Sequence, residues 1–323
     1  HRPVALKLLA EDLADSPSAR QRFLREARAA SSLSHPSIAT EFGAGEADRQ
    51  VYIALALIDG ETVADCAARQ PFELGHGVRV AIAGAEALGH AHGRGVIHRD
   101  VTSRNIMIDR EGRVFVLDFG LAFMTDRTRL TTHETGMGTA AYMAPEAVLG
   151  RDADPRTDLY GLGVVLYEAL TATLPFLQDR PEGLLYAAVH EPPEPPRKRR
   201  ADLPEWVDAV VLRLLEKKPE DRYQDADALI ADLRRWGSAE QGLRVSHALL
   251  EASAPREAAL PARANAVAVL PFRLLATSPV DADEHRQLAQ GLTESVIGSL
   301  GRAAGLEVVP LAMNEAPDPT IAR

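Results

Sequence analysis

The sequence predicts an α+β protein in which short strands come first and helices dominate later. Apolar, β-branched runs at 4–9 and 51–58 are typical of strands. Beyond residue 150 the apolar spacing becomes helical, in the stretches 158–170, 182–189, 204–216 and 225–236. Because strands and helices are segregated along the chain, we expect two lobes, a small one built on a sheet and a larger helical one.

Local signals justify the remaining elements in order. Ser16-Pro17 begins a helix that runs to about residue 33, since serine caps helix N-termini and proline fits the first helical position. A longer helical pattern covers 77–92. It is followed by two short strands with a turn between them, at 106–108 and 114–117.

The C-terminal part of the chain predicts a separate unit. Residues 237–264 are polar, alanine-rich and weakly periodic, which is typical of a linker between a domain at 1–236 and another at 265–323. The last domain reads strand, helix, strand, at 267–272, 284–302 and 306–310. One such unit is too small to be stable alone, so we expect the domain to continue past Arg323.

Composition narrows the function classes. The 323 residues include 36 basic and 46 acidic side chains, a formal charge of −10, which argues against a general nucleic-acid binder. The single cysteine, Cys66, excludes an intramolecular disulfide and a cysteine-cluster metal site, and a reducing, cytoplasmic compartment fits best. No apolar run reaches the roughly 18 residues that a membrane span needs. The chain starts at His1 in place of methionine, so we expect both ends to be cuts in a longer protein.

The densest polar constellation lies around the predicted hairpin. His98-Arg99-Asp100 precedes it, and Asn105 and Asp118 bracket it, with Asp118 followed by Phe119-Gly120. A hairpin brings its two ends together, so an amide oxygen and a carboxylate can converge there. Two carboxylates and an amide suit Mg²⁺ plus a general base. The alternative is a solvated loop with a turn aspartate, but both triplets at this spacing are highly specific.

These residues resemble the eukaryotic-type protein kinases, and the resemblance covers residues 1 to about 236. Further family motifs follow in the family's order: Val4-Ala5-Leu6-Lys7, Ala144-Pro145-Glu146, Asp158 in Thr157-Asp158-Leu159-Tyr160-Gly161, and Arg222 in Pro219-Glu220-Asp221-Arg222-Tyr223, expected to pair with Glu146. The resemblance implies a bilobal kinase fold and an ATP- and Mg²⁺-dependent bacterial serine/threonine protein kinase that acts on protein substrates in signal transduction. Gly138-Thr139-Ala140-Ala141-Tyr142-Met143 favours serine/threonine acceptors.

The resemblance also implies roles for single residues. Asp100 would accept or orient the proton of the substrate hydroxyl, and Asp118 and Asn105 would hold Mg²⁺. Lys7 would contact the α- and β-phosphates and pair with Glu26, which lies on an apolar face of the helix predicted at 16–33 and so needs a partner. The adenine ring would be held by Ala5, Leu55, Ala56, Ile58 and Met107.

The sequence departs from the family pattern in two places. Thr102 stands where most serine/threonine kinases carry a lysine, and Arg104 stands where tyrosine kinases place a compensating arginine. The alternative for Arg104 is a solvated loop cation. The glycine-rich loop that should precede Val4 is absent from the sequence, which we attribute to truncation. In the activation segment we expect autophosphorylation at Thr131, Thr132 or Thr135. Arg99 could bind the phosphate group of such a phosphothreonine.

Two rival functions stay open, as does the identity of the tail. A pseudokinase that binds nucleotide or scaffolds partners without turnover is favoured by Thr102 alone, and a small-molecule phosphotransferase is disfavoured by Ala144-Pro145-Glu146. The basic run 197–200 could form a lipid or nucleic-acid patch, but we expect a solvated loop. The tail at 265–323 resembles the start of a TolB-like domain.

Overall fold

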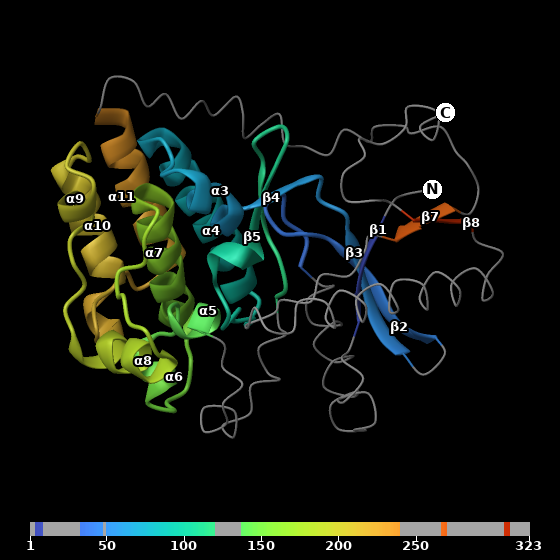
Figure 1. Cartoon of the computed structure of the whole chain (residues 1–323), viewed down its shortest axis with the longest axis horizontal. Helices are drawn as coiled ribbons and strands as arrows, with labels where there is room; N and C mark the ends of the chain where they lie inside the picture. Colours follow the sequence, from blue (N-terminus) through green and yellow to red (C-terminus); the bar gives the residue numbers. More distant parts are fainter. Residues whose placement is uncertain are drawn as a thin grey trace. The chain divides into compact units, whose positions relative to one another are not determined.

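The computed structural model describes residues 4–8, 33–47, 50–119, 137–239, 266–269 and 307–310. The chain divides into two compact units. The first unit comprises 1–31, 40–57 and 256–323, and the second comprises 32–39 and 58–255. Figure 1 shows both units, with labels on most of their helices and strands.

The first unit holds an antiparallel sheet of three strands in the order β1-β3-β2. The strands are β1 (Val4–Leu8), β2 (Glu41–Ala47) and β3 (Gln50–Ala56). In the central strand Val51 and Ile53 are fully buried, with Lys7 paired to Ile53 in register. The strands predicted at 4–9 and 51–58 are thus present as β1 and β3, and β3 ends two residues earlier than predicted. The helix predicted at 16–33 lies almost wholly outside the described residues.

A second, two-stranded sheet in the same unit joins β7 (Ala266–Val269) and β8 (Glu307–Pro310) in parallel. Parallel strands need a crossover connection of a dozen or more residues, usually a helix. The pairing agrees with the strand–helix–strand order that the sequence predicts. The predicted helix at 284–302 lies outside the described residues, and the domain that the strands were expected to begin stays a prediction.

The second unit is mainly helical and also carries a small sheet in the order β4-β5-β6. Its longer helices are α3 (Val63–Arg69), α4 (Leu74–His92), α7 (Pro155–Thr171), α8 (Pro181–His190), α10 (Glu205–Leu214) and α11 (Ala226–Ala239). Its strands are β4 (Gly60–Thr62), β5 (Ile106–Asp109) and β6 (Val114–Val116). Short turns of helix are η1 (Ser103–Asn105), α5 (Met137–Ala140), α6 (Pro145–Val148), α9 (Pro196–Arg199) and η4 (Pro219–Asp221).

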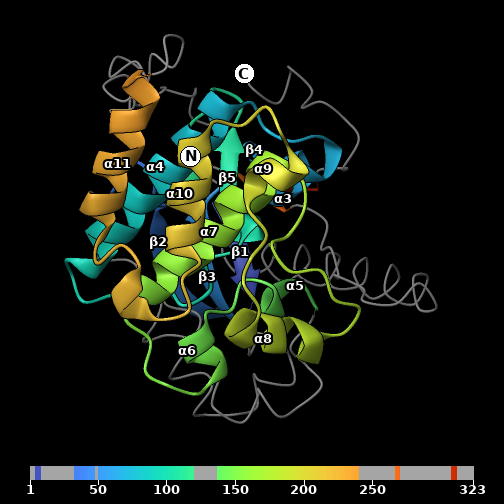
Figure 2. The ribbon, with the colours of Figure 1, turned by 90° about the vertical axis from the view of Figure 1, so that its left-hand side faces the viewer.

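Helix α7 forms the centre of this unit, because it is apolar on nearly every side and buries almost all of its residues. It packs against both α4 and α10, while α11 packs on α4 (Figure 2). Two glycines permit this approach. A Cβ at Gly84 of α4 would lie 2.9 Å from the side chain of Leu162, and one at Gly163 would lie 2.6 Å from that of Leu214. The helix begins at the capping box of Asp154 and Thr157.

The basic run 197–200 is not a free loop, so the expectation of a solvated loop is only half right. Its residues fall in α9 and at the end of that helix. Arg200 donates to the carbonyl oxygens of Phe72 at 2.6 Å and Leu170 at 3.2 Å. Because Leu170 lies in the last turn of α7, the positive charge of Arg200 stabilises the C-terminus of that helix. Arg199 pairs with Glu194 at 2.6 Å. Only Arg197 and Lys198 present their charges outward without an ion pair among the described residues.

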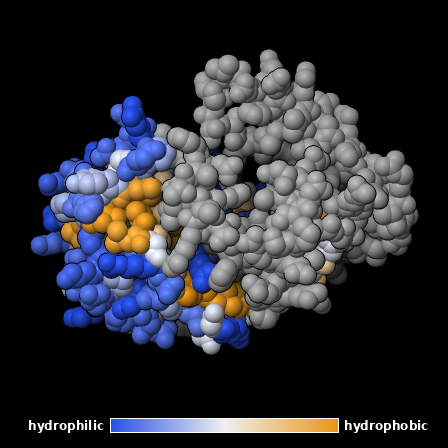
Figure 3. Space-filling model, turned by 90° about the horizontal axis from the view of Figure 1, so that it is seen from below, coloured by the Kyte–Doolittle hydropathy of each residue, from blue (hydrophilic) through white to orange (hydrophobic). Residues whose placement is uncertain are grey.

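None of the helices in the described ranges is long and apolar enough to cross a membrane. The face shown in Figure 3 is largely hydrophilic where the residues are described, with apolar patches among the charged side chains. Exposed large apolar residues in the helical unit include Leu149, Leu177 and Tyr186.

Candidate active site

The loop that carries Asp100 is held from beneath by Asp158, a residue of α7 that is only 1% exposed. One carboxylate oxygen accepts a hydrogen bond from the backbone N–H of His98 at 2.8 Å and another from the ring of His92 at 2.7 Å. The other oxygen accepts from the backbone N–H of Arg99 at 2.7 Å. Three hydrogen bonds offset the cost of burying the Asp158 carboxylate. Through two of them, α7 fixes the position of the loop backbone at His98 and Arg99.

The backbone is strained on either side of the hairpin. Arg99 and Asp118 adopt left-handed φ values of 68° and 59°, which cost roughly 1–3 kcal/mol each in residues other than glycine. The hydrogen bond from the Arg99 N–H to Asp158 helps to keep this conformation. Strain of this kind persists only where surrounding contacts impose it. The contacts around these two turns therefore hold the backbone that positions Asp100 and Asp118.

His98 joins the two strained turns. Its Nε2 lies 2.7 Å from the carbonyl oxygen of Leu117, so Nε2 carries the proton and donates. Its Nδ1 then accepts from the backbone N–H of Asp100 at 3.3 Å. The ring of His98 is fully buried and meets the edge of Phe119 with 4.7 Å between the ring centroids. The loop before the hairpin and the segment after it are therefore one packed assembly.

Asn105 contacts Asp100 and lies beside Asp118. Its amide nitrogen donates to both the carbonyl and a carboxylate oxygen of Asp100, each at 2.9 Å. Its own carbonyl accepts from the N–H of Leu117 at 2.8 Å, which places Asp118 one residue beyond that bond. The backbone bond from Leu117 to Asn105 joins the two ends of the hairpin. The convergence of the Asn105 amide with the Asp118 carboxylate stays a prediction.

These side chains fit a hard divalent cation. Both N–H donors of the Asn105 amide point to Asp100, so the amide oxygen is the group left for a cation. An amide oxygen with the carboxylate of Asp118 is a donor set that suits Mg²⁺. Histidines and cysteines form no alternative metal cluster in the part of the chain that the structure describes.

The remaining predicted nucleotide residues are spread over both units. Ala5 and Lys7 lie on β1, opposite Leu55 and Ile53 of β3. Ala56, which ends β3, donates its N–H to the carbonyl of Thr40 at 2.8 Å. Ile58 and Met107 belong to the second unit, both half-buried. Predicted residues that fall outside the described ranges are Glu26, Gly120, Thr131, Thr132 and Thr135.

Thr102 and Arg104 differ in accessibility. Thr102 is 6% exposed, whereas Arg104 is exposed on η1, directly before Asn105. The loop therefore presents a cation at position 104 and none at position 102. A short, buried hydroxyl cannot replace a lysine that reaches outward.

The predicted pair of Glu146 and Arg222 is confirmed. The guanidinium grips the carboxylate with two hydrogen bonds of 2.8 and 2.7 Å, and Arg222 is 1% exposed. The Thr157 hydroxyl adds a third bond to Glu146 at 2.9 Å. Burial alone would raise the pKa of Glu146, but the hydrogen bonds and charge of Arg222 outweigh burial and hold that pKa below its usual value.

Sequence reasoning missed a contact that ties the catalytic loop to the segment before α6. The Ser103 hydroxyl lies 2.7 Å from the hydroxyl of Tyr142, which in turn donates to Glu168 of α7. A partial signal was present, because Tyr142 stands three residues before Pro145, which begins α6, and belongs to the motif at 138–143. Its partners lie 39 and 26 residues away and could not be read from local spacing.

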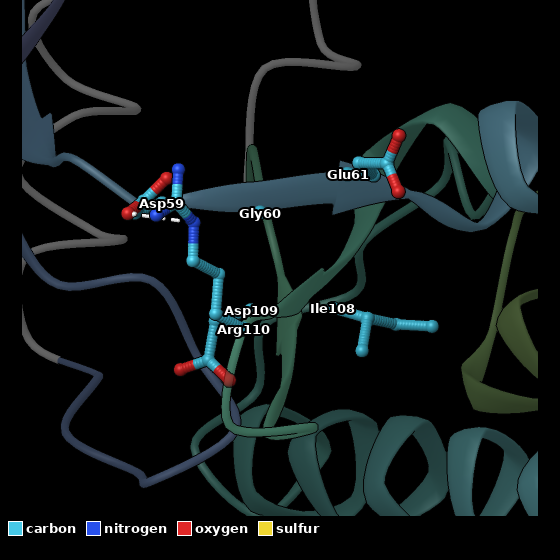
Figure 4. A pocket seen from close by; sticks show the side chains of 6 residues that line it. All are labelled: Asp59, Gly60, Glu61, Ile108, Asp109 and Arg110. Atoms are coloured by element: carbon cyan, nitrogen blue, oxygen red, sulfur yellow. Dashed lines mark ion pairs between the residues drawn. The ribbon is translucent and has the colours of Figure 1, made fainter. Parts of the chain in front are cut away.

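A pocket of about 360 Å³ lies elsewhere, along β4 and β5, lined by Asp59, Gly60, Glu61, Ile108, Asp109 and Arg110 (Figure 4). Each of its carboxylates already has a cation. Arg110 pairs with Asp59 at 3.1 Å, and arginines outside the lining pair with Glu61 and Asp109 at 2.6 Å. This pocket is therefore a charged surface depression distinct from the residues around Asp100.

Comparison with known proteins agrees with this geometry. The model of the protein kinase domain family matches residues 1–232. The chain is 42% identical over 246 residues to serine/threonine-protein kinase PknB of Mycobacterium leprae, covering 74% of this chain and 40% of that protein. It is 41% identical over 242 residues to PknB of Mycolicibacterium smegmatis, covering 73% and 39%. The chain thus spans about 40% of the length of these relatives.

Among solved structures, the kinase domain of Mycobacterium tuberculosis PknI superposes with a TM-score of 0.57 at 28% identity, covering 72% of this chain and 85% of that domain. The predicted fold, with a small sheet lobe and a helical lobe, is confirmed for this region. The chain therefore belongs to the protein kinase domain family, and its kinase domain is of the serine/threonine type found in these bacterial relatives.

Proposed function

We propose that this protein transfers the γ-phosphoryl group of ATP to serine and threonine hydroxyls of protein substrates, as part of bacterial signal transduction in the cytoplasm. The observation that carries the proposal is the contact between Asn105 and the carboxylate of Asp100 at 2.9 Å, beside Asp118. This bond holds the carboxylate of Asp100 in a fixed orientation beside the Asn105 amide, and Asp118 follows the residue whose N–H bonds to the Asn105 carbonyl. Phosphoryl transfer needs such positioning more than covalent participation by the protein.

Each residue then has a defined task. The carboxylate of Asp100, oriented by Asn105, accepts or orients the proton of the acceptor hydroxyl. Asn105 and Asp118 would hold Mg²⁺, which supplies charge compensation for the phosphates when it is bound. Lys7 would bind the α- and β-phosphates and pair with Glu26. The adenine ring would be bound by Ala5, Leu55, Ala56, Ile58 and Met107.

Arg104 would stabilise the transferred phosphoryl group in place of the lysine that Thr102 replaces. The exposure of Arg104 on η1 and the burial of Thr102 support this assignment. The alternative function is a pseudokinase that binds nucleotide or partners without turnover, and the observation that favours it is Thr102. Retention of Lys7 together with the contact between Asp100 and Asn105 favours the active enzyme.

Control of activity would pass through the activation segment. We expect autophosphorylation at Thr131, Thr132 or Thr135, with the exposed Arg99 as the receptor of the phosphate. The domain limits we propose are 1–236 for the kinase, 237–264 for the linker and 265–323 for the start of a TolB-like domain. The parallel pairing of β7 with β8 supports an α/β unit in the last part.

The test is Asp100→Asn in the full-length protein. It should abolish radiolabel transfer from ATP to a generic protein substrate and leave ATP affinity in calorimetric titration almost unchanged, because the carboxylate acts on the acceptor and not on ATP. The exposed Asp152, changed to Asn, serves as a matched control with unchanged transfer. Wild-type turnover in Asp100→Asn would overturn the assignment.

A further inference from the structure

A histidine shapes the segment 33–39, which belongs to the helical unit. The backbone N–H of Ser37 donates to Nδ1 of His35 at 3.1 Å, and the N–H of Ile38 donates to the carbonyl oxygen of His35 at 3.0 Å. A backbone N–H can only donate, so Nδ1 of His35 has to be unprotonated for the first of these bonds to form. The turn therefore depends on the neutral form of the ring.

A second histidine, His90 of α4, is held in the same form. Its ring lies beside that of His35, with 5.1 Å between the ring centroids, and its Nδ1 lies 3.2 Å from the guanidinium of Arg94. A guanidinium offers donors only, so this Nδ1 also acts as an acceptor. The pattern disfavours a metal site, since a histidine that binds a metal through Nε2 donates through its other ring nitrogen.

The charges around the two rings oppose the entry of a proton. Burial, followed by the charges of His90 and Arg94, lowers the pKa of His35. Burial, followed by the charge of Arg94, lowers the pKa of His90. The acid one turn earlier on α4, Glu86, is bound to Arg234 of α11 at 2.6 Å. Protons therefore enter the pair only below the ordinary histidine value of pH 6.5, where adjacent positive charges would repel one another.

The turn at His35 also carries strand β6. The carbonyl oxygen of Ser37 accepts from the N–H of Val116 at 2.9 Å, and the N–H of Ala39 donates to the carbonyl of Val116 at 3.0 Å. Ser37 and Ala39 are both buried. The side chains of β6 are apolar throughout, so this strand offers no charge that would compensate a proton on His35.

Strand β6 leads directly to the candidate active site. The residue after it, Leu117, donates its N–H to the carbonyl of Asn105 at 2.8 Å and accepts from the ring of His98 at 2.7 Å. Asp118 is the next residue. A displacement of segment 33–39 would therefore reach the backbone before Asp118 through β6.

We propose that His35 and His90 form a proton-sensitive latch: the neutral rings hold segment 33–39 on α4 and β6, and protonation of His35 in mildly acidic solution releases the segment and lowers phosphoryl transfer. His90 and Arg94 set the pH at which this happens, because their charges oppose the proton on His35. The effect on transfer rests on the proposed kinase activity, whereas release of the segment can be measured without any activity.

The first experiment is amide hydrogen exchange of the full-length protein from about pH 7.5 to about pH 5.5, the range in which histidines titrate, corrected for the intrinsic exchange rate at each pH. The protection of the Ser37, Ala39 and Val116 amides in wild type should fall roughly fivefold, the effect of losing about one hydrogen bond. Amides of α7 should keep their protection, which separates local release from global unfolding.

The matched variant is His35→Asn. Oδ1 of asparagine can accept from the N–H two residues on, as Nδ1 of His35 does, and it does not titrate. Its protection at Ser37 and Val116 should therefore stay constant over the same pH range. If this variant does not fold, His90→Gln decides the question: without the opposing charge of His90, the loss of protection should begin at a higher pH than in wild type.

The second experiment compares kcat/KM for a protein substrate at about pH 7.5 and about pH 6. Between these values wild type should lose roughly fivefold more activity than His35→Asn, while the two should be equal at the higher pH. The exposed His190 supplies the control, since His190→Gln should keep the pH dependence of wild type.

The results separate the latch from the proposed function. An equal loss of protection in wild type and His35→Asn, or a loss shared by the α7 amides, would overturn the latch. Release of the segment with the same pH dependence of transfer in wild type and His35→Asn would overturn its control of activity. A wild-type protein that phosphorylates no protein at any pH would overturn the proposed function, and hydrogen exchange would still decide whether the latch exists.

Discussion

The ion pair of Glu146 with Arg222 offers a quantitative test of what holds the helical unit together. Arg222 donates five hydrogen bonds, two to Glu146 and three to the carbonyl oxygens of Arg156, Glu216 and Lys217. In Glu146→Ala the three carbonyl bonds remain, but the guanidinium stays buried without its counter-charge. Removing one partner of a buried pair costs about 3–5 kcal/mol.

The lost bonds give a similar magnitude. Two hydrogen bonds that involve charged groups contribute about 1.5–3 kcal/mol each. For a domain of this size, each kcal/mol shifts the Tm by about 2–4 °C. Glu146→Ala should therefore lower the Tm by roughly 10 °C in scanning calorimetry. The exposed pair of Asp59 and Arg110, with side chains 71% and 68% exposed, supplies the control, since Asp59→Ala should cost roughly 0–1 kcal/mol.

The effect also has a defined pH dependence. The pKa of Glu146 is lowered from its usual 4.5 in the folded protein, so its stabilisation is present above pH 4.5 and is lost as pH falls through the lowered pKa. The difference between wild type and Glu146→Ala should shrink in that acidic range. A loss no larger than that of Asp59→Ala, at neutral pH, would refute the reasoning.

Three other outcomes are expected. In steady-state kinetics, Arg104→Ala should lower kcat by on the order of a hundredfold, about 3 kcal/mol, with little change in KM for ATP. Adding Thr102→Lys to this variant should recover part of the lost kcat. If Arg104→Ala leaves kcat unchanged and Thr102→Lys rescues nothing, the pseudokinase is favoured. Gly60→Ala would place a carbon 2.1 Å from a backbone oxygen of β5, so calorimetry should show destabilisation of roughly 1–3 kcal/mol; an unchanged melt would contradict this packing. Burial lowers the pKa of His35 and of His90, whose rings lie 5.1 Å apart, so the unfolded chain binds more protons below pH 6.5. Stability should fall as pH drops below 6.5, and His35→Gln should flatten that slope in urea titrations; an identical slope would exclude His35 as a cause.

The parts of the fold that the sequence predicts are those with a strong local signal. Helix α7 was expected at 158–170 and begins three residues earlier, because the capping box at Asp154 and the following proline start it. The strands at 106–108 and 114–117 were predicted from the turn residues between them, and β5 and β6 pair there as a hairpin. The pair of Glu146 and Arg222 was expected from family resemblance, since no local pattern joins residues 76 positions apart.

The elements that were missed are those whose stability comes from distant partners. Strand β2 contains Gly43 and Gly45 and has little strand propensity of its own, and it forms because β3 pairs with it. Helix α3 is different, because the sequence contains a helix-start signal for it, a threonine at the N-cap position. In the structure the Thr62 hydroxyl caps the helix by accepting a hydrogen bond from the N–H of Asp65 at 3.1 Å. The role of Arg200 at the C-terminus of α7 could not be read from local spacing, because its acceptor Leu170 lies 30 residues away.

The clamp of Asp158 on the catalytic loop bears on how freely that loop can vary. Two of its three bonds are to backbone N–H groups, and every residue except proline offers one. The two backbone bonds from the loop to Asp158 therefore do not depend on which side chains stand at 98 and 99. Substitutions such as Thr102 and Arg104 can change the charge presented to a phosphoryl group without moving Asp100. Point mutations can thus change the charge and the hydrogen-bonding groups of the loop, while its backbone bonds to Asp158 are kept.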